Sequence, residues 1–153
     1  MHEGLLLTLA LLCSGYLLSI VFEEVLFRGV ILGLLRPSGV WRAVLVSSAL
    51  FGLTHLSNSS LRGFSVLIVL QAVGAAVQGI GYAALRLRTN TIWLLIAFHF
   101  LHDVTLQMGH LPIAMVEAPI DIALAVYGIV LLRGRRSQEL PALLPVSREL
   151  AAG

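Results

Sequence analysis

Residues 5–22 read LLLTLALLCSGYLLSIVF and carry no charged side chain over 18 positions. The apolar character continues to about Leu35, interrupted by the charged residues Glu23, Glu24 and Arg28. An α-helix needs about 20 mostly apolar residues to cross the hydrocarbon core of a bilayer. Because backbone groups in lipid must be hydrogen-bonded within their own segment, we expect this stretch to be a membrane-spanning helix.

Four further apolar stretches follow it along the chain. Residues 43–61 and 63–85 contain no Asp, Glu or Arg, whereas residues 91–108 and 113–132 carry a few ionisable side chains. The sequence therefore predicts an all-α fold, a polytopic membrane helix bundle of about five transmembrane helices. We expect residues 1–133 to form a transmembrane catalytic domain and residues 134–153 to form a cytoplasmic tail.

The composition agrees with a membrane protein. The chain is 58% apolar and 12% charged, whereas an average soluble domain is about 45–50% apolar and about 25% charged. This composition excludes a disordered chain and argues against a soluble globular domain. A single Cys excludes an intrachain disulfide, and a net charge of +2 gives no reason to expect a nucleic-acid partner. The expected partner is the lipid bilayer.

The arginines predict how the chain is oriented in the membrane. If the first segment starts outside, eight of the ten basic residues fall on the cytoplasmic side and Arg62 falls outside. Positive residues concentrate in cytoplasmic loops, so we expect the C-terminus to lie in the cytoplasm. The eight residues are Arg36, Arg42, Arg86, Arg88, Arg133, Arg135, Arg136 and Arg148.

Several ionisable residues lie inside the apolar segments. On insertion scales, such a group costs about 2.5–3.5 kcal/mol at the centre of a bilayer, and it usually marks a functional site. A set of this kind needs mutual partners. Its members are Glu23, Glu24, Arg28, His55, His99, His102 and Asp103.

Helical spacing predicts which of these side chains meet. Glu24 and Arg28 are four residues apart, so they share a helix face and can form a buried ion pair. Glu23 points about 100° away from Glu24. It has no local cation, which suits a general base. His99 and Asp103 are also four residues apart and share a face.

Three of these residues lie at comparable depths in the membrane. Glu23 is thirteen residues from Arg36, and His55 is fourteen from Trp41. At a helical rise of ~1.5 Å, these spacings correspond to roughly 20 and 21 Å. His99 is nine residues, or roughly 14 Å, from the nearest cytoplasmic end of its segment. Helix tilt can absorb such differences, so we expect Glu23, His55 and His99 to share one site.

Two kinds of hydrolytic chemistry fit these residues. Glu23, His55 and His99 could hold Zn²⁺ with one position open for water. Alternatively, Glu23 and His55 could activate water directly while His99 and Asp103 stabilise an oxyanion. The residues leave both mechanisms open.

The other notable residues are interpreted as structural. We expect His102 to be a bystander, Glu117 and Asp121 to be solvated near the outer interface, and Phe51 to pack. The many small residues within residues 63–85 predict close helix packing.

Three short motifs resemble those of a known family. They are EEVLFR at residues 23–28, FGLTH at residues 51–55 and HFLHD at residues 99–103. They match Glu-Glu-x-x-x-Arg, Phe-x-x-x-His and His-x-x-x-Asn/Asp, in that order and on separate hydrophobic segments. The chain thereby resembles the CAAX protease and bacteriocin-processing (CPBP, or Abi) family of intramembrane peptidases, which includes the type II CAAX prenyl endopeptidases.

The resemblance implies an intramembrane endopeptidase that acts on prenylated C-termini or bacteriocin-like peptides in a bacterial plasma membrane. It implies that Glu23 activates water beside His55, and that Glu24 and Arg28 form a supporting pair. It further implies that His99 and Asp103 complete the site. The family is labelled as metalloprotease, which suggests Zn²⁺, but a metal-free glutamate mechanism is equally compatible.

Two functions from other classes use the same features. One is a non-catalytic membrane scaffold or bacteriocin self-immunity protein on the same fold. The other is a proton or ion relay, since intramembrane Glu, His and Asp also build such pathways.

Overall fold

The computed structural model describes residues 2–108 and 113–133, together with Leu143 and Arg148. Within these ranges every regular element is helical and no strand occurs. The predicted all-α class is therefore confirmed. The expected tail, residues 134–153, lies outside the described residues apart from Leu143 and Arg148.

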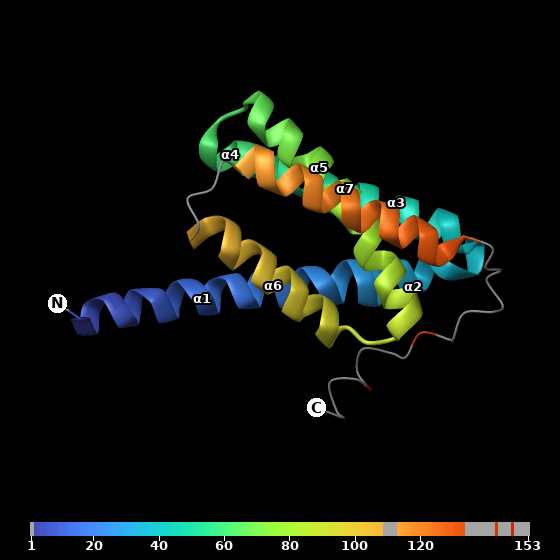
Figure 1. Ribbon diagram of the computed structural model, residues 1–153, viewed down its shortest axis with the longest axis horizontal. Helices are drawn as coiled ribbons and strands as arrows, with labels where there is room; N and C mark the ends of the chain where they lie inside the picture. Colours follow the sequence, from blue (N-terminus) through green and yellow to red (C-terminus); the bar gives the residue numbers. More distant parts are fainter. Residues whose placement is uncertain (1, 109–112, 134–142, 144–147, 149–153) are drawn as a thin grey trace.

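The described residues form five long helices, the number that the apolar stretches predict (Figure 1). Short helical elements lie between α1 and α3 and between α3 and α5. The long helices are α1 (His2–Glu24), α3 (Val40–Thr54), α5 (Val66–Thr89), α6 (Trp93–Met108) and α7 (Ile113–Leu132). The short elements are the π-helix η1 (Val25–Ile31), α2 (Leu32–Leu35), the 3-10 helices η2 (Arg36–Ser38) and η3 (His55–Asn58), and α4 (Ser59–Arg62).

The helices form two groups that face each other (Figure 1). In one group α1, η1 and α2 continue into one another as a long rod, and α6 packs against α1. In the other, α5 packs between α3 and α7. The α2–α3 connection joins the groups at one end, where a core cluster links α2, α3, α5 and α7. Its buried members are Leu32, Val40, Ala43, Val44, Ala83, Ala84, Leu87 and Leu132.

Small residues explain how closely α5 approaches its neighbours. A Cβ atom placed on Gly52 of α3 would lie 2.6 Å from the Cβ of Ala76 in α5. A Cβ on Gly81 of α5 would lie 2.6 Å from the carbonyl oxygen of Leu124 in α7. Real side chains do not tolerate such distances, so these helices meet backbone to backbone. The interpretation of the small residues as a packing surface is confirmed.

Two helical segments of the described chain are long and apolar enough to cross a membrane, Val40–Asn58 and Val66–Thr89. A shorter apolar helix covers Trp93–Thr105. Large apolar side chains point outward along these helices, among them Leu67, which is 71% exposed. Such outward-facing residues suit a lipid environment better than water.

One arginine of the predicted cytoplasmic set is buried within the bundle. Arg86 lies in the last turn of α5 and is fully buried, so it is not a loop residue. Because basic residues near the end of a membrane helix count toward its orientation, the predicted orientation stays a prediction based on all eight residues.

Candidate active site

The first motif spans a change in helix type. Glu23 and Glu24 end α1, and Arg28 lies in the π-helix η1 that follows. π-Helical turns are rare and frequently occur at functional sites. A guanidinium nitrogen of Arg28 lies 3.2 Å from Glu24 Oε1, and both side chains are fully buried. The predicted Glu24–Arg28 ion pair is confirmed.

Glu24 also fixes the orientation of a histidine from a distant helix. His99 Nδ1 lies 2.8 Å from the same Oε1 atom, although the two residues are 75 positions apart. A carboxylate oxygen can only accept a hydrogen bond, so His99 Nδ1–H donates to Glu24. This contact turns the other ring nitrogen, Nε2, away from Glu24.

Two further carboxylates face His99 Nε2. Glu23 Oε2 lies 3.9 Å from it, and Asp103 Oδ1 lies 3.7 Å from it. The side chains of Glu23 and Asp103 are 26% and 32% exposed, whereas that of His99 is 5% exposed. Ser19 Oγ donates a 3.3 Å hydrogen bond to Glu23 Oε1. The buried imidazole therefore presents one nitrogen to two partly exposed carboxylates.

Phe51, from the second motif, is the apolar centre of the site. The Arg28 guanidinium carbon lies 4.0 Å from the centre of its ring, close enough for a cation–π contact. The Phe51 ring also meets the rings of Phe27, His55 and His99 edge-on, with centroid distances of 5.2, 4.9 and 6.0 Å. Phe51 is fully buried, which confirms its interpretation as a packing residue.

His55 lies on the Phe51 ring and does not reach the carboxylates. Its Nδ1–H donates to the carbonyl oxygen of Phe51 at 3.1 Å, one turn earlier in the same helix. His55, Glu23 and His99 all lie in the described part of the chain, and His55 makes no hydrogen bond or ion pair with either of the other two. The structure thus brings together Glu23, Glu24, Arg28, His99 and Asp103, with His55 next to this group.

The predicted zinc ligands do not form a ready-made metal centre. In the part of the chain that the structure describes, no three His, Cys, Asp or Glu side chains are grouped so that they could hold a metal ion. The expected set of Glu23, His55 and His99 is not among such groups, although the hydrogen bond from His55 Nδ1–H to the Phe51 carbonyl leaves its Nε2 atom able to accept. We therefore assign no step of the reaction to a metal.

A second group of polar side chains joins the site through Asp103. His102 Nδ1 lies 3.4 Å from Asp103 Oδ1 and 3.2 Å from the amide nitrogen of Gln78 on α5. Asp121 of α7 lies within electrostatic range of His102 and is only 3% exposed. The sequence analysis did not single out Gln78. The expectation that Asp121 is solvated was wrong. Both stand out as polar residues within apolar helices, which was the available signal.

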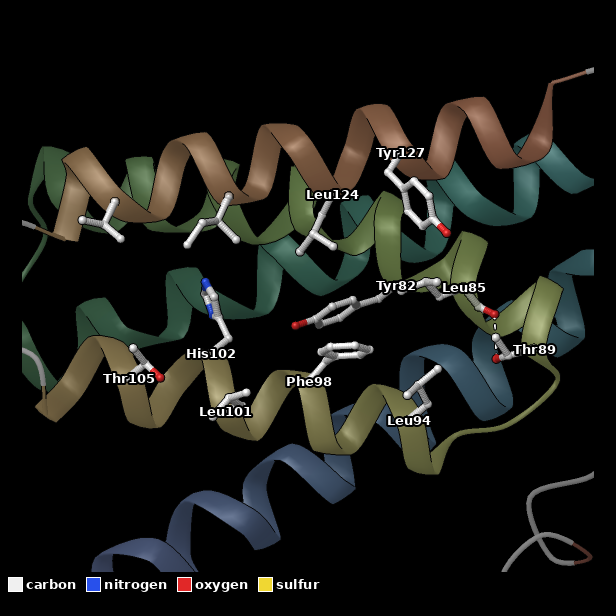
Figure 2. A pocket seen from close by; sticks show the side chains of 12 residues that line it. Tyr82, Leu85, Thr89, Leu94, Phe98, Leu101, His102, Thr105, Leu124 and Tyr127 are labelled. Carbon is white, nitrogen blue, oxygen red and sulfur yellow. Dashed lines mark hydrogen bonds between the residues drawn. The ribbon is translucent and has the colours of Figure 1, made fainter.

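An apolar cavity of about 640 Å³ opens between α5, α6 and α7 (Figure 2). Tyr82 forms part of its wall, and the Tyr82 ring also lies 5.5 Å from the His99 ring, measured between centroids. The cavity therefore lies next to the carboxylate–histidine site. Its lining residues are Tyr82, Leu85, Thr89, Leu94, Phe98, Leu101, His102, Thr105, Val116, Ile120, Leu124 and Tyr127.

Fold and site together define a helical bundle of membrane type with a buried Glu–Arg–His group beside two accessible carboxylates. The chain matches the family model described as Type II CAAX prenyl endopeptidase Rce1-like over residues 5–105. It belongs to this family, and the resemblance seen in the three motifs is confirmed. No curated protein and no solved structure gives a significant match. Membership indicates a membrane-embedded hydrolase of the CAAX prenyl protease type, acting on peptide or prenylated protein substrates.

Proposed function

We propose that this protein is an intramembrane endopeptidase in which Glu23 activates the attacking water. One observation carries the proposal: Glu23 and Asp103 both face His99 Nε2, while Glu24 holds His99 Nδ1 at 2.8 Å. An imidazole fixed at one nitrogen and open at the other suits a group that must act on a reacting atom. Glu23 adds a base that water can reach.

The proposed reaction balances with these residues alone. The Glu23 carboxylate takes a proton from water as the water oxygen bonds to the carbonyl carbon of the substrate. The carbonyl electron pair moves to its oxygen, and His99 Nε2–H donates a hydrogen bond to that oxyanion. Glu23 then passes its proton to the leaving amine as the C–N bond breaks. The products are a carboxylic acid and an amine.

Asp103 and His55 have supporting roles in this proposal. Asp103 Oδ1, 3.7 Å from His99 Nε2, stabilises positive charge on the ring while Nε2–H donates. The Nδ1–H of His55 is bound to the Phe51 carbonyl, so its Nε2 keeps a free lone pair. That nitrogen can accept a hydrogen bond from water or from a substrate N–H group.

The cavity supports a substrate with a long apolar group. It is lined mainly by Leu, Ile, Val, Phe and Tyr side chains and lies next to the site. Burying an apolar chain there is favourable by roughly 0.8 kcal/mol per CH₂ group. We therefore propose prenylated C-termini as the first substrate class and bacteriocin-like peptides as the second.

We also propose a bacterial plasma membrane as the location, with the C-terminus in the cytoplasm, on the family resemblance and the distribution of arginines. Reporter fusions after Arg133 would test this orientation. A signal from a reporter that is active only outside the cytoplasm would contradict a cytoplasmic C-terminus.

The decisive experiment is cleavage of a farnesylated peptide and of its unmodified counterpart by the purified protein in liposomes. We expect the farnesylated peptide to be cleaved faster. We expect Glu23→Gln to lower the rate by about 10²–10⁴-fold, the contribution of a general acid–base residue, while the helical circular dichroism stays unchanged. Cleavage by Glu23→Gln at the wild-type rate would contradict the proposed mechanism.

A chelator distinguishes this mechanism from a zinc mechanism. We expect EDTA to leave the rate unchanged. Loss of activity with EDTA, followed by recovery with Zn²⁺, would contradict the metal-free mechanism and favour a zinc mechanism. Absence of cleavage by folded protein would instead favour the scaffold or self-immunity function.

A further inference from the structure

Tyr82 lies where the catalytic group and the cavity share a wall. One side of its ring faces the Arg28 guanidinium carbon at 5.4 Å and the His99 ring at 5.5 Å. The same residue lines the cavity, where Phe98 lies beside its ring (Figure 2). Tyr82 is almost fully buried, so its position is fixed by packing from both sides.

His102 and Thr105 lie at one end of the cavity, and the opposite, mainly apolar end also carries the hydroxyl groups of Thr89 and Tyr127 (Figure 2). The Tyr82 hydroxyl points toward the half in which His102 lies, whereas Leu94, Leu85 and Tyr127 lie toward the other half (Figure 2). The Tyr82 side chain also lies within electrostatic range of Glu24, Arg28, Asp103 and Asp121. The side chain is therefore close to the carboxylate–histidine site, while its hydroxyl points along the cavity toward His102.

Other polar side chains along the cavity are less available to a ligand. The Thr89 hydroxyl donates to the carbonyl oxygen of Leu85 at 2.9 Å. His102 Nδ1 is in contact with Gln78 and Asp103. Tyr127 lies away from the catalytic group, at the apolar end. Tyr82 combines a hydroxyl that can both donate and accept with direct contact to His99.

We propose that Tyr82 is a specificity-determining residue that hydrogen-bonds a backbone amide of the substrate, next to the scissile bond, while the apolar chain of that substrate occupies the cavity. The proposal rests on the proposed function. The Tyr82 hydroxyl would then favour substrates in which the apolar group and the peptide bond at Glu23 have one particular separation. A ligand with the apolar chain but no amide gains nothing from this hydroxyl.

Equilibrium binding in the Glu23→Gln background tests this without cleavage. The probes are a farnesylated pentapeptide and farnesol, which has the chain but no amide. We expect Tyr82→Phe to weaken binding of the pentapeptide by roughly 3- to 10-fold, the value of one net hydrogen bond, and to leave farnesol binding unchanged. Tyr16→Phe, which removes a hydroxyl from α1 at a position outside the cavity lining, should change neither.

Each other outcome has a defined meaning. Equal weakening for both probes would show that Tyr82 only shapes the cavity, which overturns the proposal. Unchanged binding of the pentapeptide overturns it as well, even when the wild-type protein cleaves that peptide. Failure of the folded protein to bind either probe would overturn the proposed substrate class together with this inference.

Kinetics of the cleaving enzyme give an independent readout. Tyr82→Phe should raise KM for the farnesylated peptide by the same 3- to 10-fold factor, with a smaller change in kcat. A purely structural role would instead lower the unfolding midpoint and weaken the binding of farnesol as much as that of the farnesylated peptide.

Discussion

Replacing Glu24 by Gln tests the buried pair at the centre of the site. The substitution keeps the shape of the side chain but removes its charge, which leaves Arg28 as a buried cation. Arg28 and Glu24 are 1% and 0% exposed, so water cannot replace the lost partner. Breaking a buried ion pair by removing one member costs about 3–5 kcal/mol. The cation–π contact of Arg28 with Phe51 remains. We therefore expect the free energy of unfolding to fall by about 3 kcal/mol, the lower end of this range.

Unfolding in mixed detergent micelles, followed by circular dichroism, measures this loss. Glu23→Gln is the matched control, because Glu23 is the adjacent residue, is 26% exposed and has His99 rather than an arginine as its charged neighbour. We expect the control to change the free energy of unfolding by about 0.5 kcal/mol or less. If Glu24→Gln proves as stable as this control, the assignment of a stabilising buried pair is wrong.

The double variant Glu24→Gln/Arg28→Met separates stability from positioning. Removing both charges should recover stability to within about 1 kcal/mol of wild type, because apolar replacement of a buried pair is often neutral. Cleavage should stay low, because Glu24 Oε1 no longer holds His99 Nδ1 at 2.8 Å as a charged acceptor. Wild-type cleavage by the double variant would refute the positioning role of Glu24.

Two further predictions concern helix packing and the second carboxylate. Gly81→Val should lower the free energy of unfolding by about 1–3 kcal/mol, because its Cβ would lie 2.6 Å from the Leu124 carbonyl oxygen. Gly33→Ala, which meets no atom within 4 Å, should leave the unfolding midpoint unchanged or slightly higher, and an equal effect of both variants would contradict the packing argument. Asp103→Asn should reduce the cleavage rate by less than about tenfold, far less than Glu23→Gln, because Asp103 lies 3.7 Å from His99 Nε2, is 32% exposed and acts on that ring only through its charge. A loss as large as that of Glu23→Gln would make Asp103 an equal candidate for the base.

The helices were predictable because the signal for them is local. The bounds of a run of about 20 apolar residues can be read directly from the sequence. The predicted segment 113–132 coincides with α7 (Ile113–Leu132). The π-helix η1 was not predictable in this way. It begins directly after Glu24, where Arg28 must reach both that carboxylate and the Phe51 ring. Its geometry therefore goes together with a contact to Phe51, a residue too distant in the sequence to appear in a local pattern.

The site was predictable in part for the same reason. Spacing of four residues correctly paired Glu24 with Arg28, and the depth comparison correctly placed Glu23 near His99. The same comparison placed His55 with them, and the structure puts His55 next to this group, on the Phe51 ring that also meets His99, without a hydrogen bond to Glu23 or His99. α3 ends at Thr54, and His55 turns its Nδ1 to the Phe51 carbonyl. Depth along a membrane normal fixes one coordinate only, and side-chain direction at a helix end depends on local hydrogen bonding.

Asp121 shows that the depth of a charged residue in the membrane does not by itself decide whether its side chain is solvated. Proximity to a predicted interface suggested solvation, yet Asp121 is 3% exposed, and its Oδ2 atom lies 3.0 Å from where a Cβ on Gly74 would stand. Close packing of α7 on α5 buries the carboxylate whatever its depth. Asp121 lies within electrostatic range of His102, which contacts Gln78 and also Asp103 of the carboxylate–histidine site. The proposed catalytic and substrate-binding residues are therefore neighbours, and variants on the cavity side of Tyr82 should alter substrate choice before they alter chemistry.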